Sequence, residues 1–159
     1  VAAAIFYLAA YTLTSFGAWG VVIALEKADG KGLDIAEYAG LGRRQPLLAA
    51  AMTVFMLSLT GIPPTLGLVG KFYLFRAVLA GGTTALYWLA VIGVLTSLLS
   101  AYYYLRVVVL MNMQEGAPQV TRETWLDLTI GAMAVVTVVL SLFPAALFDW
   151  ASQAVLKLF

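Results

Sequence analysis

The chain has 159 residues, of which 63% are hydrophobic and only 11% are charged. Because a soluble domain needs far more polar surface, this composition predicts a membrane protein surrounded by the lipid bilayer. A net charge of +1 gives no reason to expect a nucleic-acid partner. Cys and His are both absent, so the chain lacks the usual ligands of iron–sulfur clusters, haem and zinc, and any redox chemistry is expected on another chain.

The N-terminal residues predict a first membrane span from about 2 to 25. The sequence begins without an initiator Met or a basic leader, which indicates a piece of a longer chain; a processed natural N-terminus is the alternative. Within the span, Tyr7, Tyr11 and Thr14 recur at i, i+4 and i+7 and therefore share one helical face. Such a stripe usually faces neighbouring helices, where its hydroxyls form hydrogen bonds, and simple helix packing is the favoured interpretation.

Residues 26–45 form a polar connection in which acidic and basic side chains balance. The segment DIAEYAGLG within it predicts a short surface helix, with Asp34 as N-cap and Gly40 or Gly42 closing it. The carboxylates could be read as an acid–base pair, but a solvated loop with balanced charges is the favoured interpretation. The connection is therefore not expected to carry chemistry.

Residues 47–80 form an apolar run that is too long for one plain span and too short for two. Pro63 and Pro64 divide it into halves of about 15 residues, each rising roughly 22 Å against a hydrocarbon core of about 30 Å. Because a residue before proline is pushed out of the helical region, the run is predicted to be one discontinuous crossing, broken at 63–64. Gly61 and Gly67 flank this break. A re-entrant hairpin is the alternative.

Two further spans are predicted from about 84 to 111 and from about 125 to 143, the second ending at Pro144. On the first of these, Ser100 and Tyr103 share a face with other polar residues. Residues 148–159 look amphipathic and are predicted to lie along the membrane interface. The sequence thus predicts an all-α membrane protein, a single helical region over 1–159 with about four spans.

The distribution of basic residues favours the single broken crossing. If 47–80 crosses the membrane once, the loops at 26–45 and 112–123 share one side. That side then holds most of the basic residues, namely Lys27, Lys31, Arg43, Arg44, Arg106 and Arg122. The positive-inside rule places this side in the cytoplasm. Two crossings would separate the loops and weaken the asymmetry.

Lys71 is the candidate functional residue of the broken crossing. It follows Pro64 by seven residues, roughly 10 Å along the second half-helix, and is therefore predicted to lie well inside the membrane. A charge there costs about 2.5–3.5 kcal/mol even on a lenient insertion scale, and burial favours the neutral amine, so Lys71 could exchange its proton near neutral pH. Beside a hydrated backbone break and the hydroxyls of Thr60 and Thr65, this amine predicts a proton relay. A snorkelling lysine, or one paired structurally with an acid of another helix, is the alternative.

The stretch GIPPTLGLVGKFYLF resembles the signature of the antiporter-like membrane subunits of respiratory complex I and of the related Mrp cation/proton antiporters. The flanking stretches RRQPLLAAAMTVFMLSLT and AYYYLRVVVLM are most similar to the bacterial subunit N branch of this family, the counterpart of mitochondrial subunit 2. The resemblance covers essentially the whole chain. Because such subunits are much longer, it implies a C-terminal portion of one.

By this resemblance, residues 47–80 would be the broken helix of the second inverted repeat, and Lys71 would be the lysine at the end of its proton pathway. Candidate liners of that pathway are Thr60, Thr65, Ser100 and Tyr103. The resemblance implies a proton-translocating subunit of an NADH-quinone oxidoreductase in the bacterial inner membrane, a translocase with other membrane subunits as partners. It implies no cofactor or metal on this chain, since flavin, iron–sulfur clusters and quinone would lie on other subunits. An Mrp-type cation/proton antiporter subunit and a structural membrane scaffold are the alternatives.

Overall fold

The computed structural model describes residues 1–26, 34–82, 84–118, 120 and 123–158, and these contain helices but no strands. The long elements are α1 (Ala2–Leu25), α3 (Pro46–Thr60), α4 (Leu66–Ala80), α5 (Thr84–Met113), α6 (Thr124–Leu142) and α7 (Pro144–Leu158). Two short turns of helix, η1 (Ile35–Tyr38) and α2 (Leu41–Arg44), precede α3. The predicted all-α class, with one helix broken at its prolines, is confirmed.

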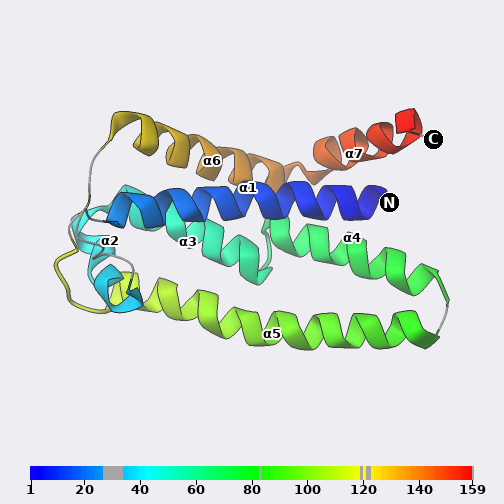
Figure 1. The fold of residues 1–159 in the computed structure, drawn as a ribbon, viewed down its shortest axis with the longest axis horizontal. Helices are drawn as coiled ribbons and strands as arrows, with labels where there is room; N and C mark the ends of the chain where they lie inside the picture. The colour runs from blue at the N-terminus through cyan, green and yellow to red at the C-terminus, as the bar shows by residue number, and fades with distance from the viewer. Residues whose placement is uncertain (27–33, 83, 119, 121–122, 159) are drawn as a thin grey trace.

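The helices lie lengthwise along one bundle, with α1 in the middle (Figure 1). In this view α6 and α7 lie above α1, and α3 and α4 follow one another below it with α5 beyond them (Figure 1). Helix α6 also packs directly against α3 and α4. Because α3 and α4 run in the same direction, the apolar run passes along the bundle once and does not fold back as a re-entrant hairpin (Figure 1).

Two hydrophobic clusters form the core, one on each side of the α3–α4 break. The larger joins the C-terminal half of α1 to α3, α5 and α6, with Val21, Phe55 and Met111 fully buried. The smaller joins the N-terminal half of α1 to α4 and α7 around Phe6 and Leu66. The break therefore lies midway along the bundle, between the two clusters.

Helix length agrees with a membrane protein. In the described part of the chain, three helices are long and apolar enough to cross a bilayer, within Ala2–Leu25, Leu86–Met113 and Thr124–Leu142. Both α3 and α4 have 15 residues, so each rises roughly 22 Å and neither spans a core of about 30 Å alone. Only the two halves together are long enough for a crossing.

The segments before α3 and after α5 meet at one end of the bundle (Figure 1). Arg43 Nη1 donates to Glu115 Oε1 at 2.9 Å, which joins the end of the first connection to the start of the second. If residues 47–80 cross the membrane once, these two connections must lie on the same side, as they do here. That this side faces the cytoplasm stays a prediction. Lys27, Lys31 and Arg122, on which the charge argument also drew, fall outside the described residues.

Two of the short-range predictions differ from the structure in detail. Asp34 stands at the N-terminus of η1 without a side-chain cap, and Gly40 adopts a positive φ of 77° that starts α2, so two short turns replace the single surface helix. The last helix begins at Pro144, earlier than 148, because proline fits a first helical turn. Its Phe148 packs against Tyr73, with ring centroids 4.4 Å apart, and its location at the membrane interface stays a prediction.

Candidate functional site at the broken helix

The first half of the crossing, α3, ends in a left-handed turn at Gly61, whose φ is 84°. The N–H groups of Gly61 and of the next residue donate to the carbonyls of Leu57 and Ser58 at 3.0 to 3.3 Å. This is the Schellman pattern, which favours glycine because a positive φ costs it little. The pattern leaves the last two helical carbonyls, those of Leu59 and Thr60, to be paired by other groups.

The ammonium group of Lys71 pairs with these two carbonyls. Lys71 Nζ donates to the Leu59 carbonyl at 3.2 Å and to the Thr60 carbonyl at 3.0 Å. Because the C-terminal end of a helix carries partial negative charge, a cation at this position is favourable. The side chain therefore reaches back from α4 to the end of α3. Among the described residues, Lys71 forms no ion pair with a carboxylate.

The first N–H groups of the second half, α4, are paired by serine hydroxyls from other helices. The Leu66 N–H donates to Ser141 Oγ at 2.8 Å, and the Gly67 N–H donates to Ser58 Oγ at 3.2 Å. Ser141 in turn donates to the Thr137 carbonyl at 2.7 Å, so α6 supports the break directly. A Cβ on Gly67 would run into the Ser58 carbonyl, which explains why glycine is needed there.

The two threonines that flank the break differ in their pairing. Thr60 is buried and its hydroxyl donates to the Met56 carbonyl of its own helix at 2.7 Å. The Thr65 hydroxyl is also buried but has no hydrogen-bond partner within the described residues. Pro63 and Pro64, joined by a cis peptide bond, form the exposed turn between them. The Thr65 hydroxyl is thus an unused polar group at the centre of the break.

A small cavity of about 10 Å³ adjoins Lys71 on the side that faces α1. This volume is close to the minimum of about 10–15 Å³ that one water needs. Hydroxyl-bearing residues line much of it, namely Tyr7, Tyr11, Thr14 and Ser58. The predicted polar stripe of α1 therefore lines the same cavity as the lysine, while the Thr14 hydroxyl donates to carbonyls of its own helix.

Ser100 and Tyr103 are not brought to this cavity. The Ser100 hydroxyl donates to the Thr96 carbonyl of its own helix, and the Tyr103 side chain is 64% exposed. The adjacent residue Tyr104 instead turns inward, within electrostatic range of Tyr7 and Tyr11. One step along a helix rotates a side chain by about 100°, which separates the inward tyrosine from the outward one.

Comparison with known proteins decides the family. The chain matches the family model described as NADH:quinone oxidoreductase/Mrp antiporter, TM, over residues 1–100. The chain belongs to this family. NADH-quinone oxidoreductase subunit N of Trichlorobacter lovleyi is 42% identical over 95% of this chain and 31% of that protein. Subunit N of Chloroflexus aggregans is 41% identical over 97% of this chain and 31% of that protein.

A solved structure has the same fold. A chain of the respiratory complex I from Thermus thermophilus with bound Aureothin superimposes with a TM-score of 0.73 at 31% identity. The match covers 91% of this chain and 34% of that one. The predicted resemblance to the antiporter-like subunits, and to their subunit N branch, is therefore confirmed. This chain spans about a third of the length of the curated relatives that it matches.

The side chains that complete the site in this antiporter-like chain were only partly predictable. Ser58 and Ser141 cap the second half-helix, yet a single serine in an apolar helix gives no sign of where its hydroxyl points. The spacing of the α1 hydroxyls did predict that they share one helical face, but it does not predict which helix that face contacts. Among the described residues, no group of three or more His, Cys, Asp or Glu side chains is arranged to hold a metal ion.

Proposed function

We propose that this chain is the part of a proton-translocating subunit N of NADH-quinone oxidoreductase in which Lys71 takes up and releases protons. The family and the names of the relatives support the enzyme class. The single observation that carries the role of Lys71 is its position on the two end carbonyls of α3, beside a cavity lined by hydroxyls.

The protonation state of Lys71 would be coupled to the break. The ammonium form donates to both carbonyls and is attracted by the negative end of α3. When the proton leaves, the amine keeps donors but loses that charge, so its hold on α3 weakens. Release and rebinding of one proton would therefore loosen and tighten the contact between the two halves of the crossing.

The hydroxyls around the cavity give the proton a route toward α1. Ser58, Tyr7 and Tyr11 adjoin the space next to Lys71, and Tyr104 of α5 continues the cluster. The cavity is too small for a column of water, so transfer along this side would use hydroxyls, with about one water between them. This arrangement suits a gated path better than an open channel.

The electron transfer that drives this movement would take place elsewhere in the complex. Flavin, iron–sulfur clusters and quinone would be held by other subunits, and the partners of this chain would be other membrane subunits. The multi-pass chain would lie in the bacterial inner membrane. Its basic connection before α3 would face the cytoplasm, since Arg43 and Arg44 lie at that end. An Mrp-type antiporter subunit shares the family description, but the relatives named above favour subunit N.

The test replaces Lys71 in the complete complex, reconstituted in vesicles. Lys71→Ala removes the proton carrier, so we expect transfer through this path to fall at least about 100-fold, the low end for loss of a proton-transfer group. Lys71→Arg keeps a permanent charge on the α3 carbonyls but cannot release a proton at working pH. We expect it to assemble normally and still lower the number of protons moved per NADH, measured with a pH-sensitive dye against NADH oxidation.

Arg76→Ala is the matched control, because Arg76 is an exposed cation on the same helix. We expect it to keep the wild-type ratio of protons to electrons. A normal ratio in both Lys71 variants, with complexes of normal subunit content, would exclude the relay.

A further inference from the structure

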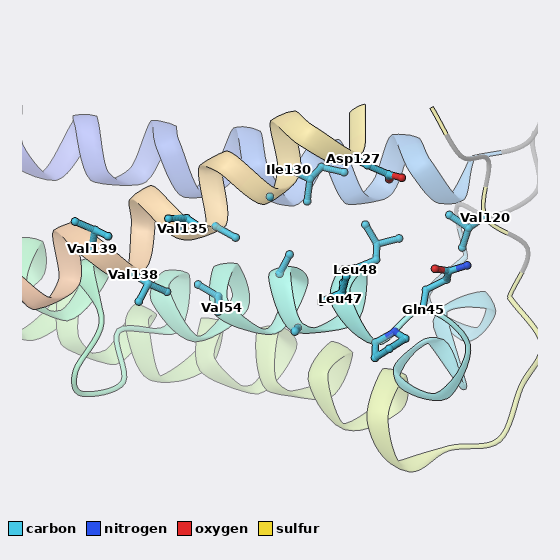
Figure 2. Close-up of a pocket in the computed structure, with 15 residues that line it drawn as sticks. Gln45, Leu47, Leu48, Val54, Val120, Asp127, Ile130, Val135, Val138 and Val139 are labelled. Atoms are coloured by element: carbon cyan, nitrogen blue, oxygen red, sulfur yellow. The ribbon is translucent and has the colours of Figure 1, made fainter. Parts of the chain in front are cut away.

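A second opening lies between α3 and α6 (Figure 2), and its lining shares no residue with the cavity beside Lys71. It is a groove of about 660 Å³, which is within the range of roughly 300–1,000 Å³ of sites that hold one small molecule. Nearly all the side chains along it are apolar, among them Leu47, Val54, Val135 and Val139. Leu47 is 84% exposed and Val135 is 62% exposed, so the groove is open along its side.

The groove has one polar end and one apolar end. Gln45 and Asp127 lie at the end where α3 and α6 begin, and the valines of α6 lie toward the middle of the bundle (Figure 2). From Pro46 to Val54 the α3 wall rises about 12 Å, and from Asp127 to Val139 the α6 wall rises about 18 Å. One leaflet of a hydrocarbon core measures about 15 Å, so the groove is one leaflet deep.

The inner end of the groove lies next to the break described above, since Ser141 follows the last lining residue of α6, Val139, by two positions. The hydrogen bond from the Leu66 N–H to Ser141 Oγ joins α4 to α6 directly beyond it. A transmembrane helix would need a continuous surface of about 30 Å and a width of about 10 Å. A single hydrocarbon chain needs only the half-length that is present, so the shape favours a lipid chain over a helix.

We propose that this groove binds one acyl chain of a phospholipid, whose phosphate is held at the polar end by Arg44. Arg44 is exposed, directly precedes Gln45, and has no hydrogen bond or ion pair within the described residues. An arginine fork matches phosphate oxygens, and the Gln45 amide can add a further donor.

Small residues on both walls allow the chain to lie close to the backbone. Ala50 and Ala51 line the α3 wall, and Gly131 and Ala134 line the α6 wall. A Cβ on Gly131 would meet no atom within 4 Å, so a larger side chain there would fill the groove without disturbing the helix. This property gives a clean way to block the site.

The test uses the whole complex in membranes, supplied with phosphatidylglycerol that carries a photoactivatable diazirine near the end of one acyl chain. Because the diazirine lies far from the headgroup, we expect irradiation to label the inner end of the groove, residues 51–54 and 135–139. With Gly131→Phe the labelling of these segments should fall to the background, because the ring occupies the groove. The matched control Val136→Phe adds the same ring on an exposed face of α6 outside the groove and should leave the labelling unchanged.

The headgroup contact is tested separately. Arg44→Gln should weaken retention of the lipid by about two- to fivefold, as loss of an exposed ion pair implies. Arg43→Gln is its control, since Arg43 already pairs with Glu115.

The absence of label from both segments, or equal labelling with Gly131→Phe, would refute the proposal. A helix as the occupant would also refute it. A photo-crosslinking amino acid incorporated in place of Gly131 tests this directly, because it needs no thiol chemistry in a complex with other subunits. Capture of a peptide from another membrane helix in place of lipid would show that protein covers the groove.

Discussion

The broken crossing and α5 pass along the same bundle but treat their polar groups in opposite ways. Along the 30 residues of α5 the hydroxyls of Thr96, Ser97 and Ser100 all donate to carbonyls of their own helix. Between α3 and α4 the chain exposes end carbonyls and end N–H groups, and side chains from α4, α3 and α6 pair with them. The same residue types are therefore inert in one region and form a site in the other.

This difference shows that the break between α3 and α4, more than the types of residue present, creates the site. In an unbroken helix every backbone group inside the membrane is already paired, so a serine there has little to bind beyond its own turn. A break supplies donors and acceptors at fixed places and with the partial charges of helix ends. A cation such as Lys71 can then be held inside the bundle without a carboxylate partner.

The largest expected effect comes from closing the space that lets the two halves touch. Gly67→Val would drive a side chain into the Ser58 carbonyl, so α3 and α4 would have to separate. Overpacking of this kind costs roughly 1–3 kcal/mol, or more where backbone is the obstacle. We expect lower thermal stability and reduced subunit content in the purified complex.

Gly131→Ala is the control for this change, because it adds a methyl group to a helical glycine with open space beside it. It should leave the thermal stability unchanged or slightly raised, since alanine favours helix over glycine. Equal stability of the Gly67 and Gly131 variants would mean that the two halves do not depend on their close approach.

A smaller effect is expected when the serine caps are removed one at a time. Ser58→Ala and Ser141→Ala each leave a buried N–H of α4 without a partner, at a cost of roughly 1–2 kcal/mol. Ser100→Ala on α5 removes a hydroxyl that reaches only its own helix and should cost much less. Unfolding temperatures of the three variants measure the contrast. An equal loss for Ser100→Ala would show that the break gives its serines no special role.

Sequence reasoning found the break because its signals are local. Two adjacent prolines, the flanking glycines and a run too short for two spans determine where the helix stops. The place of the half-buried Lys71 along α4 was also predictable, since its distance from Pro64 is set by the helical rise. The partners of Lys71 could have been derived in part, because a Schellman end always leaves carbonyls unpaired.

The residues that approach from other helices could not be derived in the same way. Tyr103 was predicted to line the path, whereas Tyr104 is the residue that faces Tyr7 and Tyr11. The pattern of a helix tells which residues share a face, but the rotation of that face depends on packing against its neighbours. Ser141 is a similar case, since its distance in sequence from Leu66 says nothing about their hydrogen bond.

The smallest change in stability is expected for Thr65→Val, and this variant best distinguishes a structural role of the side chain from a role in proton transfer. The Thr65 hydroxyl is buried without a partner in the described residues, so it contributes nothing to folding and costs the free energy of its own desolvation. Thr65→Val keeps the shape and removes the hydroxyl, so we expect stability to stay equal or to rise by up to about 1 kcal/mol. If this hydroxyl passes or orients protons at the break, the same variant should move fewer protons per NADH.

Thr96→Val on α5 is the matched control and should pump normally, because the Thr96 hydroxyl reaches only carbonyls of its own helix. A Thr65→Val complex that is more stable and pumps at the wild-type ratio would remove this hydroxyl from the path and leave Lys71 with the hydroxyls on the side of α1.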